Sequence, residues 1–372
     1  MKSRYDDLIN YEYALNMFYK IRRNCKNKQA VYNFKLNLNS NIYNILTLLK
    51  NKKYIFSEYK IFMIRDPKYR IIMSENIQDK LVNHLVSKYV LLPSLESKLI
   101  DTNVATRIDK GSRYALEEFI KYINKLKYRK KEIYILKIDI KKYFYNIDHK
   151  ILNQKLRKYI RDKDLLELIS IIIDSTNKPY VNETITKIKE NKIEYIKKSN
   201  ISNKEKMEKI KTINSIPLYK YGKGLPIGNM TSQILAIFYM NSVDHYIKEE
   251  LKFKYYIRYM DDLMIIDTDL DKLKSSFSLI NNEIKKLKLE TNSKSNIYKL
   301  SNGISFLGYM FKLKNNNIII RYNNNTIRRI TKKLKYLKKR DIEQYNRSFG
   351  SYQGYLCKSN TKLKEKYKLN DN

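Results

Sequence analysis

The sequence predicts an α+β fold in which helices and strands alternate irregularly around one central hairpin. Two apolar runs, Tyr255–Ile257 and Leu263–Ile266, flank the segment Tyr259–Asp262. As strands, these runs form a hairpin with Asp261 and Asp262 at its tip. The other elements follow no regular strand–helix–strand order, which argues against a parallel βαβ sheet. With 372 residues, 43% of them hydrophobic, the chain can fold into two or three subdomains.

The part of the chain before the hairpin is predicted to be mostly helical. Apolar residues at three- and four-residue spacing indicate helices, and short β-branched or aromatic runs bounded by turn residues indicate strands. The predicted helices are residues 6–50, 76–92, 112–128, 149–174 and 232–246. The predicted strands are Tyr54–Phe56, Ile61–Ile64, Tyr69–Met73 and Glu132–Ile140, with a turn at Asp66–Pro67.

Three further segments complete the predicted fold. Residues 182–214 are dense in Lys, Glu and Asn, which predicts a solvated helical insertion or a mobile loop. A glycine-containing loop, Gly222–Gly228, precedes the apolar helix at 232–246. After the hairpin, the pattern predicts a helix at 271–289, a strand at Ile304–Tyr309 and a very basic helical tail at 326–372.

The charge of the chain predicts a polyanionic partner. There are 76 Lys and Arg residues against 38 Asp and Glu residues, a net charge of +38. Such an excess points to nucleic acid or an anionic membrane surface. An A+T-rich genome also enriches Lys, Asn, Ile and Tyr, but that bias alone does not produce a surplus of Lys over Glu.

Several classes of protein are disfavoured. Cys25 and Cys357 offer neither a metal-binding spacing nor a disulfide framework, which suggests a reducing cytosol. The segment Met1–Asp7 lacks an apolar signal core, and no apolar run approaches the ~20 residues of a spanning helix. We therefore expect no stable membrane association. The scattered histidines are predicted to be structural: His84, His149 and His245.

Three carboxylates are candidates for one metal site: Asp139, near the end of a predicted strand, with Asp261 and Asp262. Like charges at close range repel, so divalent cations between them would stabilise the group. Mg²⁺ prefers carboxylate oxygens and phosphates, and two ions about 3.5–4 Å apart can serve phosphoryl transfer. Asp139 and Asp261 are predicted to bridge the metals and Asp262 to support them. The alternative, that Asp261-Asp262 is only a turn, fits the flanking strands and Asp139 less well.

Five segments resemble the ordered motifs of reverse transcriptases. They are Phe62–Arg70 with its Pro-Lys-X-Arg core, Ile138–Phe144, Gly224–Gln233, Tyr259–Asp262 and Phe306–Tyr309. The resemblance implies a right-hand polymerase fold of fingers, palm with an antiparallel sheet and helices, and small helical thumb. It implies fingers and palm within 1–315, with fingers at about 1–131 and 160–216, a palm at about 132–159 and 217–315, and a basic thumb at 316–372.

The resemblance also implies roles in nucleotide binding and catalysis. Phe144 falls at the steric-gate position, where its ring would clash with a ribose 2′-hydroxyl. Lys68 and Arg70 would contact the incoming triphosphate. Lys294 would act as general acid near the leaving pyrophosphate, and the Ile140 backbone carbonyl would join the metal ligands. The alternatives are a core phenylalanine and solvated surface cations.

Further residues would contact template and primer. Asn103, Arg107, Lys110 and Gly111 resemble a second fingers motif. Tyr143 and Tyr259 would stack on or pack against the nucleic acid. The residues that would grip the primer are Phe306, Leu307 and Gly308.

One departure from the common motif narrows the resemblance. Many reverse transcriptases carry Pro-Gln-Gly-X-X-X-Ser-Pro, whereas here Ile227 replaces the glutamine and Gln233 replaces the second proline. This form resembles the enzymes of diversity-generating retroelements, which are error-prone opposite template adenines. The resemblance implies that Ile227, with Gly228 and Gln233, contacts the nucleotide and that Ile227 loosens base selection. The alternative is that Ile227 simply packs the loop.

The implied function is an RNA-directed DNA polymerase, a nucleotidyltransferase that uses two Mg²⁺ ions, with Mn²⁺ as an alternative. Its partners would be an RNA template, a DNA or RNA primer, dNTPs and a small basic accessory protein. Its setting would be mutagenic retrohoming in the cytoplasm of a prokaryotic-type cell. One alternative is a phage-defence or retron-like reverse transcriptase, and another is a non-catalytic RNA-binding protein.

Overall fold

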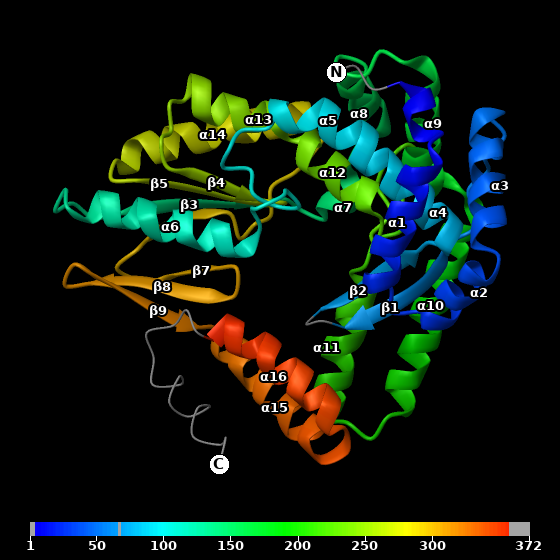
Figure 1. Cartoon of the computed structure of the whole chain (residues 1–372). Helices are drawn as coiled ribbons and strands as arrows, with labels where there is room; N and C mark the ends of the chain where they lie inside the picture. The colour runs from blue at the N-terminus through cyan, green and yellow to red at the C-terminus, as the bar shows by residue number, and fades with distance from the viewer. Residues whose placement is uncertain (1–3, 66–67, 357–372) are drawn as a thin grey trace. The chain divides into compact units, whose positions relative to one another are not determined.

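The computed structural model describes residues 4–65 and 68–356, and the chain divides into two compact units (Figure 1). The first unit contains residues 1–106, 140–246 and 280–291. The second contains residues 107–139, 247–279 and 292–372. Each unit therefore combines three stretches that are distant in sequence.

The first unit is mostly helical and contains one strand hairpin. Its helices are α1 (Tyr11–Asn24), α2 (Lys28–Leu36), α3 (Leu38–Lys50), α4 (Ile77–Leu85), α5 (Leu92–Leu95), α7 (Tyr143–Asn146), α8 (His149–Leu156), α9 (Lys163–Ile173), α10 (Pro179–Lys198), α11 (Asn203–Asn214), α12 (Met230–Tyr239) and α13 (Asn241–His245). Strands β1 (Lys60–Arg65) and β2 (Tyr69–Ser74) pair antiparallel. Ile71 and Met73 of β2 are buried against Val181 and Ile185 of α10, so the hairpin packs on this long helix.

The second unit contains two antiparallel sheets. The strands are β3 (Tyr134–Asp139), β4 (Tyr256–Tyr259), β5 (Asp262–Asp267), β6 (Asn296–Lys299), β7 (Ile304–Phe306), β8 (Tyr309–Lys314) and β9 (Asn317–Tyr322). The first sheet has the order β4-β5-β3-β6 and the second the order β7-β8-β9. Helix α6 (Ser112–Lys127) contacts β4 and β5, and its Phe119 packs against Phe306 and Phe311 of the second sheet. One helix therefore joins both sheets into one core.

The remaining helices lie near the end of the chain. Helix α14 (Leu270–Lys286) begins in the second unit and ends in the first. Helices α15 (Asn324–Arg340) and α16 (Ile342–Leu356) contact each other. Ile330, Leu334 and Leu337 of α15 are buried at three- and four-residue spacing, and most of its other residues are Lys or Arg. Residues 357–372 of the predicted tail, including Cys357, lie outside the described residues, as does the predicted turn at Asp66–Pro67.

Side-chain caps set where many of the helices begin. An Asn, Asp or Ser side chain accepts a hydrogen bond from the backbone N–H three residues further on, which satisfies one of the unpaired donors of the first turn. This cap is made by Asn10, Asn27, Asn76, Asp148, Asp162 and Ser202. Because these residues interrupt the apolar periodicity, the predicted long helices at 6–50 and 149–174 are divided into shorter ones.

Two expectations for the first unit have clear outcomes. The charged segment at 182–214 forms the helices α10 and α11, so the helical interpretation is the correct one. The strand predicted at Tyr54–Phe56 was wrong, because no strand of the described residues pairs with it. Tyr54 and Phe56 are nevertheless buried, and the Tyr54 hydroxyl donates to the Asp79 carboxylate at 2.8 Å. The alternating pattern there reflected burial and not strand pairing.

The second unit contains more strands than the sequence predicted. The predicted strand Ile304–Tyr309 is interrupted by a turn at Leu307–Gly308, where β7 ends and β8 begins. Strands β6 and β9 and most of β8 were not predicted. Among the described residues, no helix is both long and apolar enough to cross a membrane.

Candidate active site

The β4–β5 hairpin carries the two adjacent aspartates. Tyr259 and Asp262 are paired, so Met260 and Asp261 form a two-residue turn. Met260 has a φ of 55°, a left-handed conformation that suits the twist of a tight hairpin. Arg258 is fully buried and donates from its guanidinium to the Met260 carbonyl at 2.9 Å. Asp261 therefore lies in the turn, and Asp262 is the first residue of β5.

Strand register brings the third aspartate beside this hairpin. Strands β3 and β5 pair from Tyr134 opposite Asp267 to Asp139 opposite Asp262. Directly opposed residues of an antiparallel pair have side chains on the same face of the sheet. The Asp139 and Asp262 carboxylates are therefore neighbours although 122 positions separate them in the sequence.

The surroundings of Asp262 disfavour its negative charge. Burial raises the pKa of Asp262 above its ordinary value; nearby Lys137 opposes this shift and the charge of Asp139 adds to it. Lys137 lies two residues before Asp139 on β3, and its ammonium donates to the Ser305 carbonyl at 2.9 Å. At Asp262 the effect of burial therefore outweighs the favourable charge of Lys137.

The loop before β6 fixes the end of β3. The Asn292 N–H donates to the Asp139 carbonyl at 2.7 Å, and the Asp139 N–H donates to the Ser295 hydroxyl at 3.1 Å. Lys294 lies between these two contacts and has an exposed side chain. The structure thus brings the loop that carries Lys294 next to the backbone of Asp139.

The Asp139–Asp262 pair offers carboxylate oxygens to a metal ion. Among residues 4–65 and 68–356, no group of three or more His, Cys, Asp and Glu side chains is arranged to hold a metal ion. The oxygen donors of Asp139 and Asp262, half-buried neighbours on adjacent strands, nevertheless suit a hard divalent cation. Further ligands would come from Asp261 in the adjoining turn, substrate phosphates and water.

A second group of predicted residues lies in the first unit, around the loop Gly224–Gly228. The Leu225 N–H donates to the Phe144 carbonyl at 2.8 Å, and the Met73 N–H donates to the Ile227 carbonyl at 2.9 Å. Gly228 has a φ of 145°, and a Cβ there would lie 2.4 Å from the Met73 carbonyl oxygen. The loop is therefore fastened to Phe144 on one side and to β2 on the other.

The histidine at the start of α8 also holds this loop. His149 Nε2 is 2.7 Å from the Gly224 carbonyl oxygen, and His149 Nδ1 is 2.7 Å from the Asp174 carboxylate. Asn177 Nδ2 also lies 3.5 Å from His149 Nδ1, so both ring nitrogens have polar neighbours. Thr176 adds a hydrogen bond from its hydroxyl to the Gly224 carbonyl at 3.0 Å. The expectation that His149 is structural fits this geometry, although its position next to the loop was not foreseen.

The other nucleotide-binding candidates lie near the same loop or strand. Phe144, Ile227 and Gln233 are half-buried, so part of each side chain faces solvent. Lys68 and Arg70 are exposed, and Arg70 is on β2, three residues before Met73. The first unit thus joins Phe144, Ile227 and the strand of Arg70 through backbone hydrogen bonds.

Three residues predicted to contact nucleic acid are buried in the structure. The Asn103 side chain is fully buried and donates to the Ile237 carbonyl at 3.3 Å. Tyr143 is 2% exposed and its hydroxyl donates to the Ala236 carbonyl. Phe306 is 1% exposed and packs against Phe119. All three side chains pack inside the protein, and their direct contact with template or primer stays a prediction.

The remaining candidates are at least partly accessible. Tyr259 is half-buried, and burial raises the pKa of its hydroxyl. Arg107 and Lys110 are half-buried at the start of the second unit, and the Lys110 ammonium lies 5.6 Å from the centre of the Tyr114 ring. Leu307 and Gly308 have φ angles of 46° and 88°, as a type I′ turn between β7 and β8 requires. The side chain of Ile140 is buried, and this residue bridges to Thr291.

Sequence reasoning missed several residues that organise these two groups: Arg258, Lys137, Ser295, Asn292 and Asp174. Only Arg258 left a signal, because a cation inside an otherwise apolar strand must find a partner when it is buried. The others act through contacts with segments that are distant in sequence, and such contacts leave no local pattern.

Comparison with known proteins identifies the family. A family model described as reverse transcriptase (RNA-dependent DNA polymerase) matches residues 64–311, more than half of the chain. The chain belongs to the reverse transcriptase family. Reverse transcriptases have the right-hand polymerase fold, so the predicted fold class is confirmed. Both groups of candidate residues fall inside the matched reverse transcriptase region.

Other comparisons were less informative than the family match. No curated protein matches the chain. The solved structures that match include apo telomerase from Candida tropicalis, truncated from its C-terminal domain, with a TM-score of 0.44 and 15% sequence identity. This match covers 74% of the present chain and 58% of the telomerase chain, so the present chain spans less than two thirds of that structure.

Proposed function

We propose that the protein is an RNA-directed DNA polymerase that extends a DNA or RNA primer on an RNA template. The observation that carries the proposal is the opposition of Asp139 and Asp262 on neighbouring strands, with Asp261 in the adjoining turn, inside the reverse transcriptase region. Nucleotidyl transfer needs charge neutralisation and positioning more than covalent chemistry, and a group of carboxylates supplies both through divalent ions.

The ligand set proposed for the metals is Asp139, Asp261 and the Ile140 carbonyl, with Asp262 in support. Mg²⁺ bound there would neutralise the phosphates and lower the pKa of the primer 3′-hydroxyl. Asp262 is half-buried. Asn292 and Ser295 hold the Asp139 backbone in place. The exposed side chain of Lys294 would donate a proton to the leaving pyrophosphate.

The loop in the first unit would select the nucleotide. The half-buried ring of Phe144 would exclude a ribose 2′-hydroxyl, while exposed Lys68 and Arg70 would bind the triphosphate. Met73 holds the Ile227 backbone, and the Ile227 side chain has no polar group with which to test base pairing. We propose that this aliphatic contact lowers fidelity opposite template adenine, as in a diversity-generating retroelement.

The basic C-terminal part would hold the nucleic-acid backbone as a thumb at 316–372, with fingers and palm before it. Helix α15 supports this assignment because its buried face is apolar and its remaining face is rich in Lys and Arg. Phosphate binding by such a surface makes affinity fall steeply as salt concentration rises. A small basic accessory protein would assist RNA binding.

Primer extension on an adenine-containing RNA template, followed by sequencing of the product, tests both parts of the proposal. We expect Mg²⁺-dependent DNA synthesis that disappears in Asp261→Asn, with errors concentrated opposite adenine. Ile227→Gln should reduce those errors while synthesis continues. Synthesis that persists in Asp261→Asn would overturn the polymerase assignment, and accurate copying by the unmodified protein would overturn only the mutagenic one. Each reaction is repeated with native RNA and accessory protein.

A further inference from the structure

The first unit contains a basic groove outside the motifs described above. Two adjoining cavities, of about 540 and 590 Å³, share the lining residues Ser97, Lys98, Lys158 and Tyr159. Cavities of this size are typical of ligand sites. The helices α5 and α8 that adjoin the groove lie at the upper end of the unit in Figure 1, and the β1–β2 hairpin lies toward the lower end. No lining residue belongs to the loop Gly224–Gly228 or the strand of Arg70.

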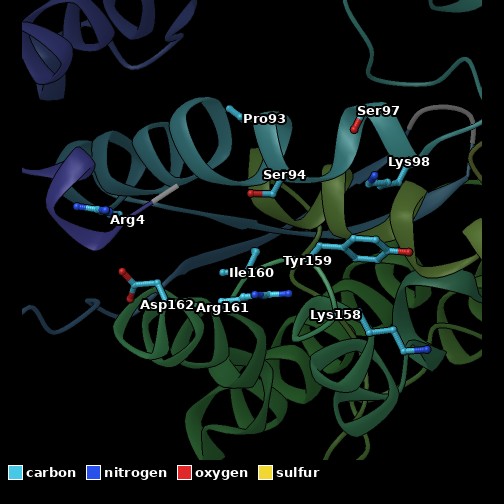
Figure 2. Close-up of a pocket in the computed structure, with 10 residues that line it drawn as sticks. All are labelled: Arg4, Pro93, Ser94, Ser97, Lys98, Lys158, Tyr159, Ile160, Arg161 and Asp162. Carbon is cyan, nitrogen blue, oxygen red and sulfur yellow. The ribbon is translucent and has the colours of Figure 1, made fainter. Parts of the chain in front are cut away.

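The walls of the groove combine cations, hydroxyl groups and an exposed ring. Figure 2 shows Ser94, Ser97 and Lys98 along one wall, with Tyr159 and Arg161 facing them from the other. The segment Arg157–Arg161 carries basic residues on both sides of Tyr159 and Ile160, and it lies in the connection between α8 and α9. Positive charge next to an exposed aromatic ring suits a chain of phosphates and bases.

The positive charge of the groove is available to a ligand. In the described part of the chain, Arg4, Lys98, Lys158 and Arg161 form no salt bridge with a carboxylate, and all four are exposed. The carboxylate of the first cavity, Asp162, already accepts hydrogen bonds from the backbone N–H groups of Tyr5 and Leu165, at 2.8 and 3.1 Å. The acid of the second cavity is paired as well, with Glu283 bound to Lys286 at 2.5 Å.

Tyr159 offers a supported stacking surface between these cations. Its side chain is 39% exposed, and its ring packs edge-on against Phe238 with centroids 5.6 Å apart. The Lys98 ammonium lies 5.9 Å from the ring centre. A ring that is held by Phe238 and is partly exposed can stack on a base at a low cost in conformational entropy.

We propose that this groove binds single-stranded RNA, with phosphates on Lys98, Lys158 and Arg161 and a base on Tyr159. The exposed Ser97 hydroxyl at the groove wall supplies a hydrogen bond for a ribose or phosphate oxygen. The site would hold a stretch of RNA outside the region being copied. It extends the proposed function, but RNA binding here requires neither catalysis nor metal.

A second basic cavity in the same unit provides a matched control. It lies on α1 and α2 and is lined by Tyr19, Arg22, Arg23, Lys28, Val31, Tyr32 and Lys35. Like the groove, this cavity is lined by cations and tyrosines. It differs in that the Lys28 ammonium already donates to the Arg22 carbonyl, at 3.3 Å. Three exposed cations can be removed from the groove, or three from this control cavity, with the same change in net charge.

The test measures binding of a fluorescein-labelled oligouridylate of about 12 nucleotides, within the range that one single-strand site covers. Fluorescence anisotropy of the full-length protein is followed over a range of salt concentrations, without metal or dNTPs. The combined variant Lys98→Ala, Lys158→Ala, Arg161→Ala should bind at least tenfold more weakly, and its salt slope should be smaller by about 2. The control Arg22→Ala, Lys28→Ala, Lys35→Ala should stay within about twofold of the unmodified protein.

A separate variant pair tests stacking. Tyr159→Ala should weaken binding by roughly fivefold or more, whereas Tyr159→Phe should bind like the unmodified protein because it keeps the ring. Tyr32→Ala in the control cavity should have no effect. Thermal unfolding of each variant identifies any that fails to fold, and Tyr159→Phe and the salt slope remain informative in that case.

Three results would overturn the proposal that the groove binds RNA. They are equal weakening by the two triple variants, no weakening by either, and a loss of binding to anionic phosphatidylserine vesicles that exceeds the loss of RNA binding. Primer extension by the groove variant on a short template should remain unchanged. A failed polymerase proposal would abolish extension by the unmodified protein and leave the RNA-binding result standing.

Discussion

The Asp139–Asp262 pair and the loop Gly224–Gly228 are held in place in different ways. Register along β3 and β5 places the two aspartates, because the whole run of paired residues from Tyr134 to Asp139 fixes which residues face each other. The loop has no such run of pairs. It is held by separate contacts from Met73, Phe144 and His149, which come from three different segments.

Because of this difference, substitutions at the two places should affect different properties of the protein. At the aspartates, one substitution changes the charge but leaves the strand register intact, because the neighbouring pairs remain. At the loop, one substitution can remove or block a contact that nothing else replaces. Substitution of either aspartate should therefore leave the fold stable but abolish DNA synthesis. Substitution in the loop should first lower the stability of the protein and its affinity for nucleotide.

The largest expected effect is that of Asp139→Asn on DNA synthesis. Loss of one charge from the proposed metal site should lower kcat by more than the ~10–100-fold that loss of an outer-shell partner costs. Stability should stay the same or rise, because the charge repulsion with Asp262 is removed. Primer extension and thermal unfolding measure the two effects.

Asp271→Asn is the matched control for this prediction. The Asp271 side chain is 91% exposed at the start of α14, and its ion pair with Lys274 is a surface pair of small energetic value. Its activity and stability should both equal those of the unmodified protein. If Asp139→Asn unfolds at a much lower temperature, Asp139 stabilises the sheet. The view that this residue contributes charge while the strand register is held by its neighbours would then be wrong.

The sequence predicted the aspartate hairpin because its information is local. Apolar runs on both sides of Tyr259–Asp262 indicate the two strands, and a strand ending in Asp139 supplies the third carboxylate. The contacts of the loop could not be predicted, because Met73 and His149 lie more than 70 residues before Gly224 and are joined to it only by the fold. The burial of Asn103 and Phe306 was missed for the same reason.

One missed element did carry a local signal. Asn315 and Asn316 have φ angles of 48° and 61° and form the turn between β8 and β9. Two asparagines between alternating apolar residues are typical of a type I′ hairpin. The high lysine and asparagine content of this region concealed the pattern in the sequence.

The next largest effect is expected from Gly228→Ala. Its Cβ would lie 2.4 Å from the Met73 carbonyl oxygen, and its φ of 145° is unfavourable for any residue with a side chain. Either the loop or β2 must move, at a cost of about 3 kcal/mol in the free energy of unfolding. The KM for dNTPs should rise at the same time, because Ile227 and Arg70 lie on the two segments that separate.

Gly222→Ala distinguishes this close approach from backbone strain. Gly222 has a φ of 70°, and a Cβ there would meet no atom within 4 Å. Its cost should be about 1 kcal/mol, that of the left-handed conformation alone. Denaturant unfolding and dNTP titration compare the two variants. Equal effects of the two substitutions would show that contact with Met73 does not hold the loop.

The smallest effect concerns Glu75, two residues after Met73. Burial raises its pKa to about 8, with Asp79 adding to the shift and Lys80 opposing it. One oxygen of this carboxyl, Oε1, is buried without a hydrogen-bond partner among the described residues. The folded protein therefore favours the neutral form of Glu75. The stability of the region around β2 and the loop Gly224–Gly228 should therefore depend on pH.

The direction of this response follows from proton linkage. Between its unfolded pKa of about 4.5 and its folded pKa of about 8, Glu75 binds more protons in the folded state. Its stabilising contribution is complete below the lower value and is lost as pH rises through the upper one. Burial lowers the pKa of His84 to about 4, so His84 adds little above pH 6.5.

The measurement is denaturant unfolding of the unmodified protein and Glu75→Gln from pH 6.5 to pH 8. The free energy of unfolding of the unmodified protein should fall by about 2 kcal/mol relative to that of the variant. Parallel curves would mean that Glu75 is already ionised in the folded protein. A difference in stability accompanied by a pH-dependent KM for dNTPs would link this carboxyl to the loop, because β2 joins Glu75 to the Met73–Ile227 hydrogen bond.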